Sequence, residues 1–134
     1  MWFASNAEET LRIGKEFGSL LSPDSIVCVF GELGAGKTTF IRGIAEGIGI
    51  DPSQVSSPTF VYLNIYEGKT PFYHFDLYRL SGVDPFLSMG FDEILFSPGI
   101  KCIEWSERIA QIIPKEAIKV TLSHKDEGRQ IEAS

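Results

Sequence analysis

The sequence predicts a single α/β domain built on a mixed sheet, mostly parallel, with antiparallel hairpins and flanking helices. Residues 26–30 form an apolar, largely β-branched run, which is typical of a buried strand. Apolar residues between positions 41 and 48 then recur at the i, i+3, i+4, i+7 spacing of one helix face. Two aromatic and β-branched runs, 61–66 and 72–75, are separated by a short segment with Gly68, which predicts a hairpin. Strand followed by helix favours parallel pairing, and the hairpin adds an antiparallel part.

The first predicted element is a helix that ends near Leu21. Ser5 or Asn6 can cap it, because a side-chain oxygen at that position accepts a hydrogen bond from a free backbone N–H. Acidic residues in the first turn favour the same end of the helix dipole. Residues 22–25, Ser-Pro-Asp-Ser, break the chain before the strand at 26–30.

The strand leads into residues 31–38, whose sequence Gly-Glu-Leu-Gly-Ala-Gly-Lys-Thr fits the phosphate-binding P-loop, or Walker A, pattern without a mismatch. Its glycines allow several backbone N–H groups to point inward, Lys37 reaches the β- and γ-phosphates, and the Thr38 hydroxyl ligates Mg²⁺. A helix follows at once, so its N-terminus also favours the anion. A purely structural glycine turn is the alternative, but it would need neither Lys37 nor Thr38. The loop therefore predicts a P-loop NTPase-like fold that binds a nucleotide with Mg²⁺.

The helix after the loop should end near Gly49, which suits a left-handed C-cap. Residues 51–60 hold too many Ser and Pro residues for a helix or central strand, and we expect a loop that can reach the nucleotide. Within it, Thr59 offers a hydroxyl of the kind that switch segments use to sense a γ-phosphate through Mg²⁺. The more common fate of such a threonine is a turn hydroxyl bonded to its own backbone.

The second half of the chain is predicted to complete the sheet and to cover it. The elements expected are the hairpin of 61–66 and 72–75, short helices at 85–89 and 91–96, a strand at 100–105, a helix at 107–113 capped by Ser106, and a hairpin of strands around 118–122 and 130–133.

Composition limits the class of protein. The 134 residues suffice for one hydrophobic core and imply no second domain. Eighteen Asp and Glu against twelve Lys and Arg give a net charge of −6, which argues against a protein that mainly grips a nucleic-acid backbone. No apolar run is long enough for a membrane span, and no signal peptide is recognisable. Cys28 and Cys102 lie in apolar strands, away from any Cys/His cluster, so we expect buried thiols in a reducing, cytoplasmic setting.

Hydrolysis requires more than a phosphate loop: a carboxylate must hold Mg²⁺, and some group must orient the nucleophile. Asp76 and Glu104 are the candidates, because each ends an apolar run, and ligands of open α/β sheets bind at the carboxyl ends of parallel strands. Each could instead cap a helix or be a solvated carboxylate at a strand end.

Four other side chains near these carboxylates are open to two interpretations. His74 lies on the same strand face as Asp76 and could position water, although a histidine in an aromatic strand is more often buried and satisfied. Tyr78 and Trp105 could stack on a base or pack at the rim of the core. Arg79 could contact phosphate or pair with an acid.

Two sequence patterns that this chain lacks limit the choice of base in the nucleotide and the class of enzyme. The sequence contains no Asn-Lys-x-Asp segment, with which small GTPases recognise guanine, so adenine is favoured. The five arginines form no cluster, whereas nucleotide kinases use an arginine-rich lid to clamp two substrates. A small ATPase or ATP-sensing module remains.

Four segments, taken in order, resemble one family. They are Gly-Glu-Leu-Gly-Ala-Gly-Lys-Thr-Thr at 31–39, Ser-Pro-Thr-Phe at 57–60, His-Phe-Asp-Leu-Tyr-Arg-Leu at 74–80 and Ile-Glu-Trp at 103–105. Together they are similar to the small bacterial P-loop ATPases of the TsaE family, also known as YjeE, which help to make threonylcarbamoyladenosine in tRNA. The resemblance implies a cytoplasmic Mg²⁺-dependent ATPase, weak alone, that assists a transferase heterodimer of TsaD/TsaB-type proteins. In that scheme ATP turnover resets the transferase, and tRNA is involved only indirectly.

The resemblance also implies roles for the residues around the phosphates. Those that would bind the nucleotide phosphates are Glu32, Leu33, Gly34, Ala35, Gly36, Lys37, Thr38 and Thr39. Thr38 and Glu104 would hold Mg²⁺, with Glu104 also orienting water, and Asp76 would be the Walker B-like acid and a further candidate Mg²⁺ ligand. Lys37, Asp76 and Glu104 are thus the predicted catalytic residues.

The remaining implied roles lie further from the loop. Thr59 would be the switch residue, Trp105 would lie beside the nucleotide, and the neighbourhoods of Ala7 and Gly128 would flank the base. One departure from the family pattern is Phe-Leu at 86–87, where an acidic pair is common, and it concerns a partner contact rather than the ATP site.

Two other functions stay open from the residues themselves. One is a nucleotide-dependent interaction module, in which ATP only orders the segment at 57–60 for partner binding. The other is a small phosphotransferase that acts on a sugar or a nucleoside.

Overall fold

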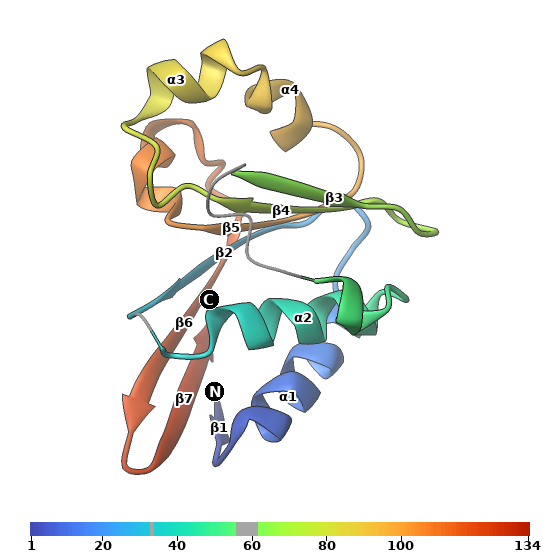
Figure 1. The fold of residues 1–134 in the computed structure, drawn as a ribbon, viewed down its shortest axis with the longest axis vertical. Helices are drawn as coiled ribbons and strands as arrows, with labels where there is room; N and C mark the ends of the chain where they lie inside the picture. The colour runs from blue at the N-terminus through green and yellow to red at the C-terminus, as the bar shows by residue number, and fades with distance from the viewer. Residues whose placement is uncertain (33, 56–61) are drawn as a thin grey trace.

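The computed structural model describes residues 1–32, 34–55 and 62–134, which form a seven-stranded sheet with helices on both faces (Figure 1). The strands are β1 (Trp2–Ala4), β2 (Ile26–Gly31), β3 (Leu63–Tyr66), β4 (Phe72–Asp76), β5 (Ile100–Glu104), β6 (Ile118–Lys125) and β7 (Gly128–Ala133). The helices are α1 (Ala7–Ser19), α2 (Lys37–Gly47), α3 (Val83–Ser88) and α4 (Phe91–Leu95), with 3₁₀ segments η1 (Pro52–Gln54) and η2 (Ser106–Ile112). Across these described ranges, no helix is long and apolar enough to cross a bilayer.

The sheet has a parallel centre and antiparallel margins. Its strand order is β1-β7-β6-β2-β5-β4-β3, in which β6, β2, β5 and β4 pair in parallel and the outer pairs are antiparallel. The predicted mixed α/β fold is therefore confirmed, and the two predicted hairpins, β3–β4 and β6–β7, lie toward opposite margins. The sequence does not predict β1, because three residues are too few to show an alternating pattern.

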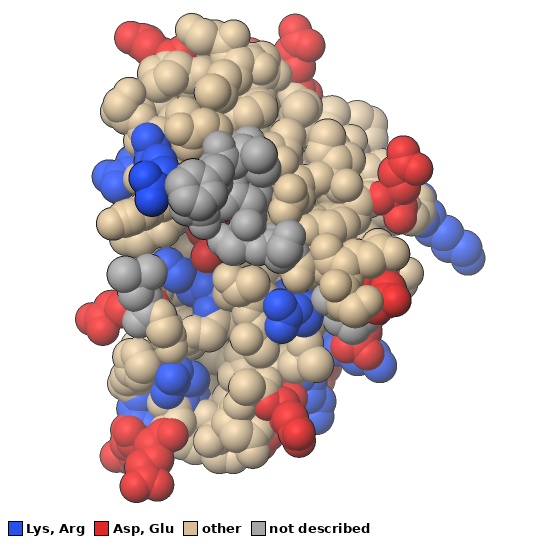
Figure 2. All heavy atoms as spheres, viewed as in Figure 1, with Lys and Arg blue, Asp and Glu red and all other residues tan. Residues whose placement is uncertain are grey.

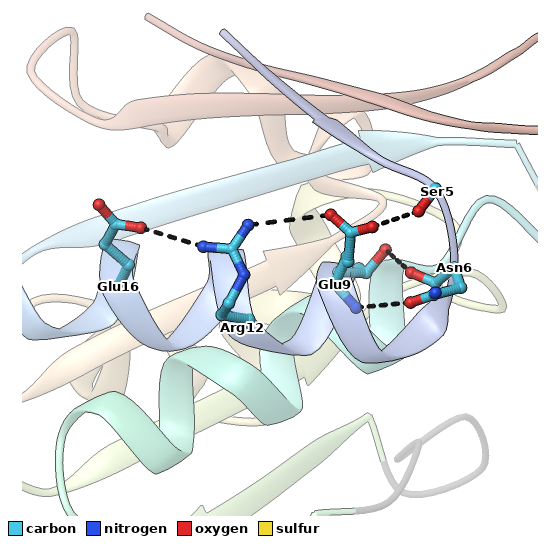
Figure 3. Close-up of polar contacts among 6 residues, drawn as sticks. Ser5, Asn6, Glu9, Arg12 and Glu16 are labelled. Atoms are coloured by element: carbon cyan, nitrogen blue, oxygen red, sulfur yellow. Dashed lines mark hydrogen bonds and ion pairs between the residues drawn. The ribbon is translucent and has the colours of Figure 1, made fainter.

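Helix α1 is fixed at its N-terminus by side chains. Asn6, one of the two predicted caps, accepts a hydrogen bond at Oδ1 from the Glu9 N–H at 2.9 Å. Ser5 instead donates to the Glu9 carboxylate, and Arg12 lies between Glu9 and Glu16 at 3.9 and 3.7 Å (Figure 3). Exposed ion pairs of this kind add little stability, whereas an N-cap contributes about 1 kcal/mol.

The two faces of the sheet bury separate hydrophobic cores. In β2, Val27 and Val29 belong to the core under α1 and α2, whereas Cys28 belongs to the core under α3, α4 and η2. Figure 1 shows α1 and α2 on one side of the sheet and α3 and α4 on the other. Burial on both faces explains why this parallel strand is a continuous apolar run in the sequence.

Helices α1 and α2 pack closely through two pairs of glycines, each pair spaced four residues apart. A Cβ added at Gly43 would lie 2.3 Å from the carbonyl oxygen of Leu11. Gly14, Gly18 and Gly47 are similarly tight, with 2.3 to 2.6 Å between such a Cβ and the backbone of the facing helix. Backbone contact along this line fixes the position of α2, and α2 begins at the phosphate loop.

Some predicted boundaries need correction. Helix α1 ends short of Leu21, within the usual fraying of helix ends. The predicted helix at 107–113 is instead the kinked 3₁₀ segment η2, with Trp105 at its N-cap position. Ser106 does not cap it, because Trp105 stands at the N-cap position and the Ser106 side chain is buried inside the segment.

The segment after α2 is described only in part. Gly49 has the predicted left-handed conformation, with a φ of 92°. Of the loop expected at 51–60, residues 56–60 lie outside the described part of the chain. Its described beginning forms the single turn η1, where Asp51 Oδ1 accepts hydrogen bonds from the N–H and hydroxyl of Ser53 at 2.9 and 2.8 Å.

Candidate nucleotide-binding site

The loop between β2 and α2 has the backbone form that its glycines predict. Gly34 and Gly36 adopt left-handed φ values of 80° and 95°, which residues with a Cβ rarely adopt. Gly36 stands at the N-cap position of α2, and none of the described side chains caps this terminus. The first N–H groups of α2, from Lys37 on, are therefore available to an anion.

The loop borders a pocket of about 530 Å³ beside the C-terminal ends of β4 and β5. The pocket is lined by Gly34, Gly36, Lys37, Thr38, Thr39, Asp76, Tyr78, Arg79, Glu104 and Trp105. Asp76 and Glu104 are the last residues of β4 and β5 and stand opposite each other in the parallel register. The pocket thus brings together Lys37, Asp76 and Glu104, which are separate in the sequence.

Three charged side chains of this pocket are buried, and the two carboxylates among them have hydrogen-bond partners. Lys37, Asp76 and Glu104 are only 8%, 5% and 4% exposed. The Tyr78 N–H donates to Asp76 Oδ1 at 3.1 Å, and the Nε2 of His74 lies 2.7 Å from Glu104 Oε2. Neither carboxylate is therefore a solvated strand end, and both are oriented by neighbouring groups.

The oxygen groups in the pocket fit a magnesium ion. Thr38 brings a hydroxyl, and Asp76 and Glu104 bring carboxylates, to the same cavity. Mg²⁺ prefers such oxygen ligands and commonly uses one or two protein carboxylates together with substrate phosphates. The described residues contain no group of three or more His, Cys, Asp or Glu that could hold a metal ion. The set therefore suits Mg²⁺ shared with a phosphate rather than a closed metal cage.

The aromatic ring of Trp105 lies beside Lys37 at the edge of the pocket. The Lys37 Nζ lies 4.6 Å from the centroid of the Trp105 ring, and the centroids of the Tyr78 and Trp105 rings lie 4.8 Å apart. The Arg108 guanidinium lies 5.5 Å from the Trp105 ring centroid and donates to the Tyr78 carbonyl at 3.1 Å. Trp105 itself has a left-handed φ of 62°, which turns the chain at the end of β5.

A second pocket, of about 280 Å³, adjoins the first through Gly34, Gly36 and Thr39. It is lined by Ala4, Ser5, Asn6, Ala7, Thr10, Gly34, Gly36, Thr39, Glu127, Gly128 and Arg129. Ala7 and Gly128, which lie at opposite ends of the sequence, thus meet beside the loop. The Arg129 guanidinium connects β7 to the loop between β2 and α2, because it donates a hydrogen bond to the Gly34 carbonyl at 3.0 Å.

Comparison with known proteins identifies the family. The model of the family described as "Threonylcarbamoyl adenosine biosynthesis protein TsaE" matches residues 4–131. The chain belongs to the TsaE family.

Relatives that match this chain over most of their own length support this assignment. The tRNA threonylcarbamoyladenosine biosynthesis protein TsaE of Treponema pallidum is 38% identical, over 93% of this chain and 92% of the relative. The protein of the same name from Nostoc sp. is 42% identical, over 97% and 82%. The crystal structure of Bacillus subtilis YdiB is 33% identical with a TM-score of 0.79, and it covers 97% of this chain and 80% of that one.

Two residues predicted to bind the nucleotide phosphates, Glu32 and Ala35, are not among those that line the two pockets described above. The Glu32 side chain is exposed and Ala35 is buried, and the Ala35 N–H donates to the Glu32 carbonyl at 3.0 Å within the loop. Leu33 and Thr59 lie outside the described residues, so their predicted roles stay predictions. His74 does not line the pocket, and its hydrogen bond goes to Glu104.

Sequence reasoning pointed to the neighbourhoods of Ala7 and Gly128 but missed two other residues that line the second pocket, Thr10 and Arg129. Thr10 comes from α1, and Arg129 comes from β7, and neither belongs to a contiguous motif. Their proximity depends on the antiparallel pairing of β1 with β7, in which Ala4 stands opposite Arg129. The resemblance around Ala7 and Gly128 was the signal that pointed to this region.

Proposed function

We propose that this protein binds ATP with Mg²⁺ and hydrolyses it as an accessory subunit of the machinery that forms N6-threonylcarbamoyladenosine at position 37 of tRNA. The pathway part rests on the relatives, which are named tRNA threonylcarbamoyladenosine biosynthesis proteins. The ATPase part rests on one observation, the pocket that Lys37, Thr38, Asp76 and Glu104 line together.

These four residues divide three tasks between them in the proposal. Lys37 and the N–H groups at the start of α2 bind the phosphates, and Thr38 with one or both carboxylates holds Mg²⁺. The metal, when bound, neutralises charge that develops on the phosphates. Glu104 or Asp76 orients the attacking water, since both carboxylates line the pocket from neighbouring strand ends.

The proposed target of this activity is a transferase heterodimer of TsaD/TsaB-type proteins, in the cytoplasm, rather than tRNA itself. The net charge of −6 disfavours direct binding to a phosphate backbone. Figure 2 shows acidic and basic side chains interspersed over the face that it presents, where a nucleic-acid surface would gather basic ones.

ATP hydrolysis by the purified protein, with and without the transferase heterodimer and tRNA, tests the proposal. We expect slow turnover alone and stimulation by the heterodimer. Lys37→Ala and Glu104→Ala should each lower kcat by about 100-fold, because they remove groups that stabilise charge at the phosphates. The matched controls are Lys69→Ala and Glu67→Ala, exposed residues in the β3–β4 turn, which should keep wild-type rates.

Other outcomes would assign the pocket differently. Full function of Glu104→Ala in a strain that depends on the protein would favour a nucleotide-dependent interaction module without required hydrolysis. Transfer of labelled γ-phosphate to a sugar or nucleoside would indicate a phosphotransferase. Turnover that the heterodimer does not stimulate would contradict the proposed target.

A further inference from the structure

A fully buried histidine lies directly behind the pocket. His74, in the middle of β4, is 0% exposed, and its Nε2 lies 2.7 Å from Oε2 of Glu104 at the end of β5. The strand register explains this contact. Asp76 stands opposite Glu104, and His74, two residues earlier, presents its side chain on the same face of the sheet as Asp76.

The chemistry of the two groups fixes the direction of the hydrogen bond. An ionised carboxylate can only accept, so the proton lies on Nε2 and His74 donates to Glu104. The other ring nitrogen, Nδ1, is buried and has no hydrogen-bond partner among the described residues. A buried polar atom without a partner costs stability, and an apolar side chain of similar size would avoid that cost. Packing alone therefore does not account for a histidine at this position.

We propose that His74 is a positioning residue, which holds the Glu104 carboxylate in one orientation at the nucleotide pocket. The inference rests on the ATPase function proposed for that pocket. The hydrogen bond occupies Oε2 and fixes the plane of the carboxylate, so Oε1 keeps one position relative to the pocket. Groups behind a metal-binding carboxylate or histidine commonly act in this way, and their removal weakens metal binding or activity.

Three variants separate positioning from packing. His74→Gln keeps a side-chain N–H donor, and His74→Leu removes it at similar volume. Phe75→Leu is the matched control, because Phe75 is also 0% exposed on β4 but belongs to the core on the opposite face. Thermal unfolding of each variant sets the temperature at which all are folded.

In the ATPase assay, His74→Leu should lower kcat by about 10- to 100-fold and raise the Mg²⁺ concentration needed for half-maximal rate, with little change in the KM for ATP. His74→Gln should recover most of this loss, and Phe75→Leu should retain the wild-type Mg²⁺ dependence. Equal losses in His74→Gln and His74→Leu, or a wild-type Mg²⁺ profile in His74→Leu, would overturn the inference.

Two further measurements do not depend on turnover. The chain has two histidines, and the other, His124, is exposed, so ¹⁵N-histidine NMR should give a distinct His74 signal protonated at Nε2, which changes in Glu104→Ala. A His74 signal protonated only at Nδ1 would overturn the inference. The proposed function fails if the wild type binds ATP without hydrolysing it. In that case the inference is still supported if the affinity for ATP depends less on Mg²⁺ in His74→Leu than it does in His74→Gln.

Discussion

At the residue scale, Trp105 connects the loop lysine to the strand ends. Its ring centroid lies 4.6 Å from the Lys37 Nζ, a cation–π contact, and 4.8 Å from the Tyr78 ring, which is tilted by 43° against it. A nucleotide that draws Lys37 toward its phosphates changes the charge next to this ring. The fluorescence of Trp105 can therefore report nucleotide binding at this site.

We expect binding of ATP with Mg²⁺ to change the emission of Trp105, because the charge on Lys37 redistributes near the indole. The chain has two tryptophans, so Trp2→Phe leaves Trp105 as the single reporter and should preserve the change. Trp105→Phe should abolish it. A fluorescence titration checks both variants, and a signal carried by Trp2 instead would contradict this arrangement of the pocket.

The sequence predicts the parts of the site that chemistry confines to neighbouring residues. Lys37 and Thr38 are recognisable because phosphate binding needs them next to each other in a glycine-rich loop. Glu104 is a candidate from its position after an apolar run, but its partner His74 is 30 residues away. That contact depends on the register between β4 and β5, which no local pattern encodes.

At the scale of elements, the contact between α1 and α2 decides where the phosphate loop lies. Helix α2 carries the N-terminus at which the phosphates are expected to bind, and it touches α1 backbone to backbone at Gly14 and Gly43. Side chains at these positions would force the helices apart.

Gly43→Ala should therefore lower the free energy of unfolding by about 1 to 3 kcal/mol, the usual cost of overpacking. In an exposed helix the same change would stabilise by about 0.5 to 1 kcal/mol, so the sign is diagnostic. Gly68→Ala is the control, because its added Cβ would meet the Ile50 side chain at 3.5 Å, an ordinary contact. Urea unfolding measures both, and a stabilised Gly43→Ala would show that the helices are less tightly packed.

Most elements could be predicted, since each has its own periodicity and its own breaking residues. The main errors, β1 and η2, have a common cause. Segment β1 exists through pairing with β7 at the other end of the chain, and η2 packs Ile109 into the same core as Cys28 of β2. Both are decided by tertiary contacts rather than by local propensity.

At the scale of the whole molecule, the buried ionisable groups link stability to pH. Cys28 and Cys102 are free thiols in the two separate cores, and burial raises the pKa of each, most strongly for Cys102. Lys101 is also buried, with its Nζ 2.6 Å from the Ser97 carbonyl, and burial lowers its pKa. The thiols and the lysine act in opposite directions on the pH dependence of stability.

The sign follows from which state holds its proton more tightly. A thiol of the unfolded chain ionises near pH 8.5, roughly its ordinary pKa, whereas the folded thiols stay protonated above that pH. The thiols therefore add no pH dependence well below this value, and stability is lost as the pH rises through it. Lys101 loses its proton earlier in the folded state, so its contribution to stability rises with pH up to the ordinary lysine pKa.

A variant with Cys28→Ala and Cys102→Ala isolates the thiols, because Lys101 is present in both proteins and cancels in the comparison. Each fully buried thiol contributes a slope of up to about 1.4 kcal/mol per pH unit above its unfolded pKa. We expect urea unfolding between pH 7 and 10 to show a steeper fall in the wild type than in the variant, even though the variant is less stable at pH 7. Parallel curves would mean that the thiols ionise alike in both states, and hence that neither core excludes water from its cysteine.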